Sequence, residues 1–172
     1  MRKIVAGFAA SLDGYITGPN GEYDWILIDK DIDFTELTKR FDTYFFGRKS
    51  YEAIVAMGSK PTPGIRHYVF SNTLTSVANG YRLVKDPIKE KVLELKQEEG
   101  KDIAVYGGAG LLASLLDLQL VDEISVSVIP VLLGKGKPMV DVLTEKVWLQ
   151  LINTKNYSNG TVQVSYNTKY KF

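Results

Sequence analysis

The segment Gly107-Gly108-Ala109-Gly110 places three glycines between a predicted strand and a predicted helix. Residues 103–106 before it read Ile-Ala-Val-Tyr, and the residues after it include leucines at 111, 112, 115 and 116. Glycines let the backbone approach an anion closely and adopt positive φ angles. The first turn of a helix then offers unpaired N–H groups and the positive end of its dipole. This segment predicts an α/β fold in which the start of a helix holds a phosphate group.

The same segment fits a familiar nucleotide-binding pattern only in part. Gly108, Gly110 and Ala113 satisfy the pattern G-x-G-x-x-A. A Rossmann site adds an acidic residue at the end of the next strand, about 20 residues further on. The next predicted strand ends in Val128-Ile129-Pro130, which contains no acid. We therefore predict a phosphate cradle without a Rossmann site, and the alternative is a helix start that simply packs on its strand.

Short apolar strands alternate with helices along most of the chain. Strands are expected at residues 3–10, 44–46, 68–70, 81–84, 103–106 and 124–129. Helices are expected at residues 50–56, 87–100 and from 109 onward, and a further helix is expected to be capped by Asp31 or Asp33 and to run to about Arg40. Two more strands, at 149–157 and 161–170, flank Asn159-Gly160, a pair that favours a type I′ turn. We expect one α/β domain over residues 1–172, with a mostly parallel sheet and an antiparallel hairpin at its C-terminal edge.

Composition and charge argue against several classes of protein. The chain has 172 residues, 45% hydrophobic and 24% charged, as in globular domains. A net charge of +1 gives no general attraction to nucleic acid or to a membrane surface, so neither partner is expected. The lack of cysteine excludes disulfides and thiolate chemistry, and the single histidine, His67, offers no metal cluster. No apolar run suits a membrane span or signal peptide, so a cytoplasmic location is expected by default.

A second basic turn, Gly47-Arg48-Lys49-Ser50, also joins a predicted strand to a predicted helix. Arginine pairs with phosphate oxygens in a bidentate manner, and lysine adds a point charge. A third strand ends in Ser71-Asn72, which supplies short polar side chains. In open α/β sheets ligands bind at the carboxyl ends of the strands. Two adjacent cations would suit a ribose 2′-phosphate, which favours NADP over NAD; the alternative for them is a solvated helix start.

These segments occur together in a recognisable order. In chain order they are Ala9-Ala10-Ser11-Leu12-Asp13-Gly14-Tyr15-Ile16, Asp24-Trp25, Gly47-Arg48-Lys49-Ser50-Tyr51-Glu52, Val69-Phe70-Ser71, Val105-Tyr106-Gly107-Gly108-Ala109-Gly110, Asp122-Glu123 and Pro130-Val131-Leu132-Leu133-Gly134-Lys135-Gly136. Nearly the whole chain thus resembles the dihydrofolate reductase-like superfamily, and within it the branch related to the reductase domain of bacterial riboflavin biosynthesis. The resemblance implies a three-layer α/β fold with a mainly parallel, twisted sheet of about eight strands. It also implies NADPH extended across the strand ends.

The resemblance assigns residues to NADPH by their position. The pyrophosphate would be held by Gly107, Gly108, Ala109, Gly110, Leu111 and Leu112. The diphosphate and the adenosine phosphates would lie near Gly47, Arg48, Lys49 and Ser50. The adenosine end would lie at Ser71 and Asn72, and the nicotinamide would be flanked by Ala10 and Ile16.

Reduction of a C=N or C=O bond requires a proton as well as a hydride, and three acids are candidates to supply it. They are Asp13, Asp31 and Asp33. The alternative for Asp13, which precedes Gly14, is to shape a turn. The alternative for Asp31 and Asp33 is to cap a helix, although they fall near the place of the acid that binds the pterin ring in dihydrofolate reductases.

Two further residues are candidates for contact with the substrate. Trp25 would form a wall of the substrate pocket or would fill the core. Lys135, in a loop rich in glycine and lysine, would bind a substrate phosphate or would lie in a solvated loop.

The resemblance implies an NADPH-dependent reductase of a small heterocycle. The preferred substrate is 5-amino-6-(5-phosphoribosylamino)uracil, and dihydrofolate is the alternative. A nucleotide-binding module without catalysis and a structural partner protein that binds no nucleotide are the competing classes. A homodimer is also expected, and the apolar residues 126–133 would form its contact or belong to the core.

Overall fold

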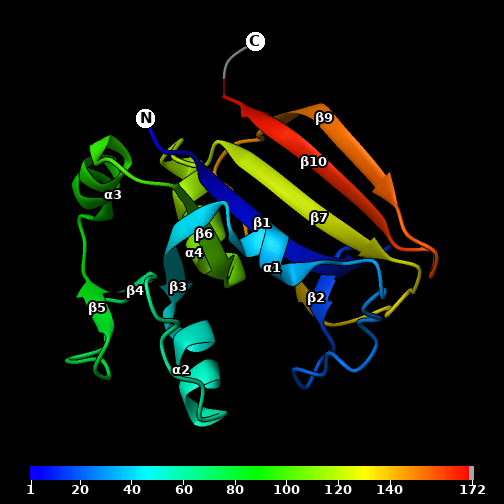
Figure 1. Ribbon diagram of the computed structural model, residues 1–172, viewed down its shortest axis with the longest axis horizontal. Coiled ribbons are helices and arrows are strands. Elements are labelled where there is room, and N and C mark those ends of the chain that lie inside the picture. The colour runs from blue at the N-terminus through cyan, green and yellow to red at the C-terminus, as the bar shows by residue number, and fades with distance from the viewer. Residues whose placement is uncertain (171–172) are drawn as a thin grey trace.

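The computed structural model describes residues 1–170, apart from the side chain of Leu37, and Figure 1 shows its arrangement. The strands are β1 (Ile4–Ser11), β2 (Tyr15–Thr17), β3 (Phe41–Gly47), β4 (Arg66–Phe70), β5 (Tyr81–Val84), β6 (Asp102–Gly107), β7 (Glu123–Ile129), β8 (Lys137–Pro138), β9 (Trp148–Asn156) and β10 (Val162–Lys169). The helices are α1 (Phe34–Thr38), α2 (Arg48–Ala56), α3 (Ile88–Gln97) and α4 (Ala109–Asp117).

Eight strands form one sheet in the order β5-β4-β3-β6-β1-β7-β10-β9, and β2 pairs separately with β8. The six strands from β5 to β7 are parallel to their neighbours. Only β10 and β9 add antiparallel pairings, at the edge that Figure 1 shows at the upper right. The α/β fold with an antiparallel C-terminal hairpin is therefore confirmed, and the carboxyl ends of six strands lie along one edge.

Alternating side chains along the strands build a core on each face of the sheet. On one face, Val92 and Leu95 of α3 and the buried leucines of α4 pack against Phe45 and Val105. On the other face, Tyr51 of α2 packs against aromatic side chains of the sheet, including Tyr44, Phe46 and Tyr81. These helices cover both faces of the sheet, which gives three layers.

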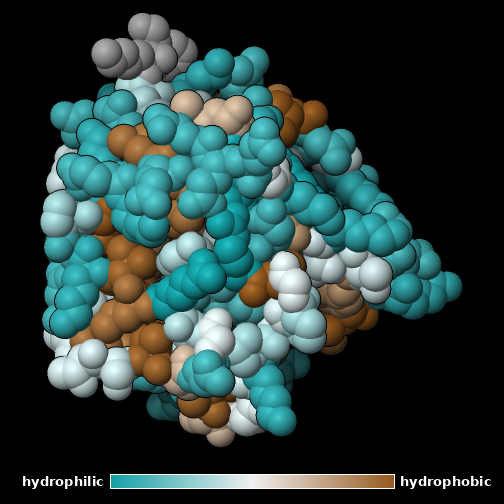
Figure 2. All heavy atoms as spheres, turned by 60° about the vertical axis from the view of Figure 1, so that its left-hand side comes forward, coloured by the Kyte–Doolittle hydropathy of each residue, from teal (hydrophilic) through white to brown (hydrophobic). Residues whose placement is uncertain are grey.

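The outer surface is mainly polar. Figure 2 shows hydrophilic side chains over most of the face that it presents, with apolar patches between them. None of the helices formed by residues 1–170 is long and apolar enough to cross a membrane.

The first helix is shorter than predicted. Only residues 34–38 are helical, because Asp33 caps the helix and its Oδ1 accepts a hydrogen bond from the Glu36 N–H at 3.1 Å. The residues before Asp33 are held elsewhere: the Asp29 carboxylate accepts hydrogen bonds from Ser158 Oγ at 2.8 Å and from the Asn159 N–H at 2.9 Å. Of the two predicted caps the helix uses Asp33, and it ends at Thr38, two residues before the predicted end near Arg40.

The β9–β10 hairpin is confirmed, but its type I′ turn is wrong. A type I′ turn needs positive φ at both central residues. Gly160 has φ +86°, whereas Gln119 is the only non-glycine residue with positive φ among residues 1–170. The Gly160 N–H donates to Tyr157 O at 3.1 Å, and the Tyr157 N–H donates to Thr161 O at 2.9 Å. The loop therefore spans three residues and ends in a left-handed glycine, because Asn159 is held against Asp29.

The predicted dimer contact falls largely inside the sheet. Strand β7 lies between β1 and β10, and Val126 and Ile129 are buried. Exposed apolar side chains gather instead on the edge strand β9, where they are Trp148, Leu149, Leu151 and Ile152. The homodimer stays a prediction, and β9 is the surface that suits it better.

His67 lies within the aromatic side chains beside α2, and its ring stacks on Phe46 with centroids 5.7 Å apart. Its Nε2 accepts the Thr62 N–H at 3.4 Å, so its Nδ1–H donates to Ile65 O at 3.0 Å. Burial lowers the pKa of His67 below its usual 6.5.

Acidification should destabilise the protein through His67. Because the folded-state pKa is lowered, the unfolded chain binds the proton first, so stability is full above about pH 6.5 and is lost as the pH falls below that value. The carboxylates titrate mainly at lower pH. Urea unfolding of the wild type at pH 7 and pH 5.5 should therefore show a fall in stability that His67→Gln largely removes. An equal fall in both proteins would contradict this.

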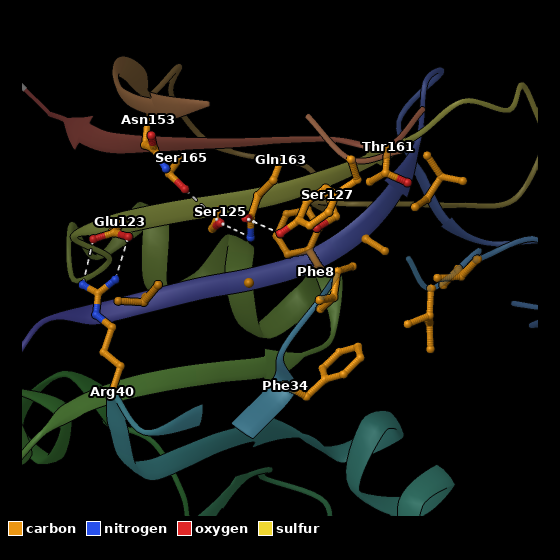
Figure 3. Close-up of a pocket in the computed structure, with 18 of the residues that line it drawn as sticks. Phe8, Phe34, Arg40, Glu123, Ser125, Ser127, Asn153, Thr161, Gln163 and Ser165 are labelled. Atoms are coloured by element: carbon orange, nitrogen blue, oxygen red, sulfur yellow. Dashed lines mark hydrogen bonds and ion pairs between the residues drawn. The ribbon is translucent and has the colours of Figure 1, made fainter. Parts of the chain in front are cut away.

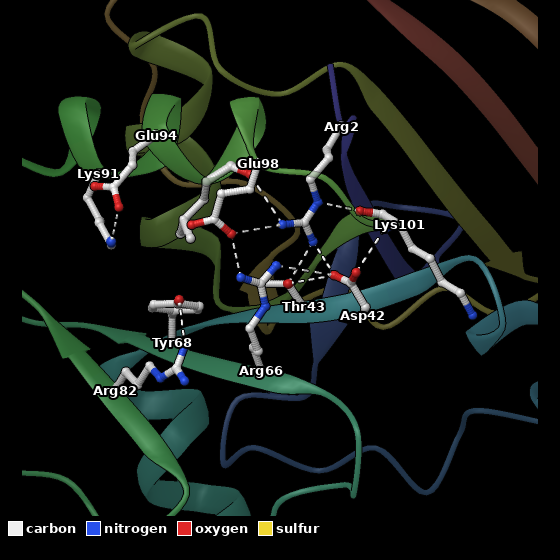
Figure 4. Close-up of polar contacts among 11 residues, drawn as sticks. Arg2, Asp42, Thr43, Arg66, Tyr68, Arg82, Lys91, Glu94, Glu98 and Lys101 are labelled. Carbon is white, nitrogen blue, oxygen red and sulfur yellow. Dashed lines mark hydrogen bonds and ion pairs between the residues drawn. The ribbon is translucent and has the colours of Figure 1, made fainter.

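At the amino ends of the parallel strands, the edge opposite their carboxyl ends, the buried guanidinium of Arg2 joins four segments of the chain (Figure 4). The Arg2 side chain pairs with Asp42 and donates to Thr43 Oγ1 at 2.7 Å. It also donates to Leu95 O at 3.2 Å and to Lys101 O. Every one of these partners lies in a different element or loop from Arg2, so one side chain ties together β3, α3 and the start of β6.

Candidate functional site

The two glycine-containing turns that the sequence singled out lie side by side at the carboxyl edge of the sheet. Strand β3 pairs with β6, with Phe46 opposite Gly107. A Cβ atom on Gly47 would lie 3.4 Å from Leu111 Cβ and 3.6 Å from Gly107 O. Ser50 Oγ lies 3.1 Å and 3.3 Å from the positions that Cβ atoms on Gly107 and Gly108 would take. The start of α2 therefore contacts the start of α4, at the edge of the sheet where the sequence predicted both turns to lie.

Glycine is required here by conformation and by space. Gly107 has φ +148°, which an L side chain rarely adopts, and Ser50 leaves little room for a Cβ. Gly108 is the N-cap of α4, so no cap side chain accepts a hydrogen bond from the first turn of the helix. The N–H groups in the first turn of an α-helix have no partner within the helix. The first turn of α4 thus combines free N–H groups with a backbone that a ligand can approach, and we call it the cradle, residues 107–111.

Two side chains that were assigned to the cradle point elsewhere. Leu111 and Leu112 are buried in the core between α4 and the sheet. The Leu112 N–H donates to Gly108 O at 3.1 Å, so the helix itself uses it. A carboxylate lies close to the cradle: a Cβ atom on Gly110 would be 3.9 Å from Asp141 Oδ2. Carboxylates are among the anions that a helix N-terminus attracts.

The predicted adenosine end lies on the same edge, but its side chains are used locally. Ser71 Oγ accepts the N–H groups of Thr73 at 3.2 Å and Leu74 at 3.1 Å. The Asn72 side chain accepts the Asp86 N–H at 2.9 Å and donates to the Asp86 carboxylate. Both residues shape the turn after β4. In contrast, Arg48 and Lys49 are exposed, and Arg48 makes one ion pair, to Glu52 at 3.4 Å.

Next to the cradle, strands β1 and β6 separate. Their pairing runs from Ile4–Ile103 to Ala6–Val105, although β1 continues to Ser11 along β7. Gly7 is exposed, and no heavy atom lies within 4 Å of where its Cβ would be. On the other side of this gap Tyr106 is 57% exposed, and its ring packs against the rings of Tyr44 and Phe46. The carboxyl edge therefore opens between β1 and β6, beside the cradle.

A cavity of about 610 Å³ lies on the face of the sheet next to this gap (Figure 3). Residues of β1, β7 and β10 form its floor, and apolar side chains between residues 26 and 34 form its roof. The apolar residues that line it are Val5, Phe8, Ala9, Ile26, Leu27, Ile28, Ile32, Phe34, Phe41, Ile129 and Ile152. Ala9 faces this cavity, whereas Ala10 is buried and lines an apolar cavity of about 430 Å³ on the other face. Ile16 is half-buried in β2 and lines neither cavity.

A row of polar side chains forms one wall of the larger cavity. Gln163 Oε1 accepts the Tyr157 O–H at 3.3 Å, and Gln163 Nε2 donates to Ser125 Oγ at 3.4 Å. Ser125 Oγ and Ser165 Oγ are 3.0 Å apart and share one hydrogen bond. Figure 3 shows these groups along β7 and β10. We call Ser125, Gln163 and Ser165 the polar wall.

An ion pair closes the end of the cavity. Arg40 Nη1 and Nη2 donate to the two carboxylate oxygens of Glu123, both at 2.8 Å, and Arg40 Nε donates to Asp102 Oδ2 at 2.8 Å. The Glu123 hydrogen bonds, followed by Asp102, raise the pKa of Arg40. Its charge is thus already matched by two carboxylates.

The three predicted acids lie outside the set of described residues that line the cavity. Asp13 joins two loops: its carboxylate accepts the Ser11 O–H at 2.7 Å, the Leu133 N–H at 3.1 Å and the Gly134 N–H at 2.7 Å. The Ser11 hydrogen bond, followed by the Gly134 and Leu133 N–H groups, lowers the pKa of Asp13. Asp33 caps α1, and Asp31 is exposed.

The two predicted substrate residues lie near each other but beyond the cavity lining. Trp25 is half-buried, and its Nε1–H donates to Glu22 O at 3.2 Å. Lys135 is exposed, and its charge helps to lower the pKa of Glu22, after the larger effect of hydrogen bonds to that carboxylate. Their roles stay predictions.

Several candidate residues were missed from the sequence. Tyr106 was noted as a strand residue and as part of a resembling segment but not as a site residue, although a tyrosine directly before the cradle is a signal that could have been used. The choice of Ala9 over Ala10 required the orientation of β1. The polar wall gives a weaker signal, the alternating Ser125-Val126-Ser127 of β7.

Comparison with known proteins places the chain in one family. Residues 2–163 match the family described as the RibD C-terminal domain. The chain is 37% identical to the uncharacterized protein YyaP of Bacillus subtilis (strain 168), over 96% of this chain and 95% of that one.

Solved structures share the fold. A "putative riboflavin biosynthesis protein" from Shewanella sp. PV-4 superposes with a TM-score of 0.85 and 26% identity, over 97% of this chain and 99% of that one. Dihydrofolate reductase from Enterococcus faecalis, solved with NADP(H), superposes with a TM-score of 0.68 and 18% identity, over 97% and 96%. The three-layer, dihydrofolate reductase-like fold is confirmed. The chain belongs to the RibD C-terminal domain family of reductases.

Proposed function

We propose that this protein is an NADPH-dependent reductase of a small heterocyclic substrate. The observation that carries the proposal is that three features follow one another along the carboxyl edge of the sheet. They are the cradle, the gap between β1 and β6, and the cavity into which the gap opens. An extended dinucleotide with a central diphosphate and a reactive ring at one end suits this order of features.

The residues fit the cofactor group by group. The N–H groups of Ala109, Gly110 and Leu111 would bind the diphosphate. Arg48 and Lys49 would bind the ribose 2′-phosphate. The gap beside Gly7 would take the nicotinamide, since backbone groups of β1 that lose their β6 partners there need others. When bound, NADPH supplies the hydride.

The chain contributes position and exclusion of water. The apolar side chains of the roof, Ile26, Leu27, Ile28, Ile32 and Phe34, would hold a flat ring against β1. A C=N bond of the substrate would gain the hydride at carbon and a proton at nitrogen, leaving NADP⁺. Hydrogen bonds keep Asp13 ionised, and Asp31 and Asp33 lie away from the cavity, so we propose that water delivers the proton.

The cavity favours an aminouracil substrate over dihydrofolate. Dihydrofolate reductases bind the pterin ring with a free acid on the first helix. Here Glu123 is the one carboxylate among the described residues that line the cavity, and Arg40 occupies both of its oxygens. The polar wall instead offers neutral donors and acceptors, which suit the carbonyl and amino groups of an aminouracil. As the sequence predicts, we propose a cytoplasmic homodimer.

The cations of α2 provide the test of cofactor choice. Arg48→Ala with Lys49→Ala should raise the KM for NADPH about tenfold or more and leave the KM for NADH unchanged, because only NADPH carries the 2′-phosphate. Lys169→Ala, an exposed lysine at the opposite edge, should change neither. The assay is NADPH oxidation with an aminouracil or with dihydrofolate.

Oxidation with dihydrofolate alone would reverse the proposed substrate. Binding of NADPH without turnover of either compound would instead favour a nucleotide-binding module without catalysis. This is the second candidate, because the described residues that line the cavity include no unpaired acid.

A further inference from the structure

We propose that the cavity binds an uncharged heterocycle that carries no phosphate group, and that the polar wall and the Thr161 hydroxyl hold its amide-like edge. This inference rests on the proposed function and specifies its substrate class. It departs from the phosphorylated aminouracil that the family resemblance implies.

The charges in the cavity leave nothing to bind a phosphate. Arg40 is the one cation among the described residues that line it. Three of its nitrogens already donate to Glu123 and Asp102, so this corner carries one positive and two negative formal charges. A dianion that entered here would lose its hydration and meet net negative charge, which is unfavourable. Lys135 lies outside the lining, near Glu22.

The polar wall retains hydrogen-bonding capacity of both signs. Ser125 and Ser165 together have two hydroxyl hydrogens, and their mutual hydrogen bond uses one of them. The Gln163 amide has two N–H groups and uses one, toward Ser125. The wall can therefore both donate to a carbonyl and accept from a ring N–H. An amide-like –NH–C(=O)– edge, as in a pyrimidinedione, presents these two groups next to each other.

Thr161 supplies an independent observation. It lines the same cavity, is 1% exposed, and its Oγ1 is the one buried side-chain polar atom without a hydrogen-bond partner among residues 1–170. Buried hydroxyls are normally paired. Figure 3 shows Thr161 beyond Gln163, at the hairpin end of the cavity, where a second carbonyl of the ligand would satisfy it.

Thr161→Val tests the role of the unpaired hydroxyl. It should raise Tm by about 2–4 °C, because the folded protein no longer buries an unpaired polar group. It should also weaken heterocycle binding about tenfold and leave NADPH binding unchanged. The matched control is Thr43→Val: Thr43 is equally buried, but its hydroxyl bonds to Arg2 and Asp42, so this change should lower Tm.

The phosphate is tested with one pair of compounds. The affinity of 5-amino-6-ribosylaminouracil and of its 5′-phosphate is measured by calorimetry, on the full chain with and without NADPH. The nucleoside should bind at least as tightly as its phosphate, and Ser165→Ala should weaken both about tenfold. Tighter binding of the phosphate by tenfold or more, binding of neither compound, or a fall in Tm for Thr161→Val would overturn the inference. Failure of NADPH to bind the wild type would refute the proposed function. The affinities of the nucleoside and of its phosphate could still be compared without NADPH.

Discussion

Gly110→Asp should abolish most NADPH binding without unfolding the protein. The new carboxylate would lie in the first turn of α4, where the diphosphate is proposed to bind, and like charges placed together cost several kcal/mol. We expect Kd for NADPH to rise at least about 100-fold, equivalent to about 2.7 kcal/mol. Tm should fall by only a few degrees: repulsion from the nearby Asp141 carboxylate is partly offset because aspartate is a better helix former than glycine and suits a helix N-terminus. Calorimetric titration gives Kd, and thermal unfolding gives Tm.

Ser114→Asp is the control for this variant. Ser114 is exposed on α4 one turn further along and lies outside the cradle. The same charge there should change the NADPH affinity by less than about threefold, since the effect of a charge falls off beyond the first turn. Equal losses in both variants would indicate a general electrostatic effect and would contradict binding at the cradle.

Arg2→Met should be the most destabilising of the substitutions considered. It removes the buried cation from the network of Figure 4. Asp42 keeps the Thr43 hydroxyl, the Lys101 N–H and Arg66 but loses its nearest cation, and the carbonyls of Leu95 and Lys101 each lose a donor. Removing one partner of a buried pair costs about 3–5 kcal/mol, which for a domain of this size lowers Tm on the order of 10 °C. Thermal unfolding at pH 7 measures the change.

Lys91→Met provides the comparison for Arg2. Lys91 also forms an ion pair, with Glu94 at 2.7 Å, but on the surface of α3. Exposed pairs contribute about 0–1 kcal/mol, so Tm should change by no more than about 3 °C. Similar losses in the two variants would show that burial of Arg2 has no special effect.

The parts of the site that the sequence predicted are those set by local chemistry. Glycines before a run of leucines identify the strand-to-helix turn at the start of α4, whatever surrounds it. Gly47 and Arg48 identify a second such turn, at the start of α2, in the same way. Parallel pairing then brings such turns to one edge of the sheet, which is why the cradle and the start of α2 were expected together.

The cavity could not be predicted because distant segments build it. Its polar wall exists only when β10 pairs with β7 in the register that puts Ser165 opposite Ser125. Its roof depends on Asp29, whose hydrogen bonds to Ser158 and Asn159 span about 130 residues of sequence. The Asn159 bond also lies in the hairpin turn, so the turn, like the roof, depends on a residue distant in sequence.

A crystal structure with NADPH bound would locate the cofactor directly. We expect diphosphate oxygens within about 3.2 Å of the backbone N–H groups of Ala109, Gly110 and Leu111. We also expect the nicotinamide between β1 and Tyr106, facing the cavity. A diphosphate bound elsewhere, with Asp141 still lying against the start of α4, would contradict binding at the cradle.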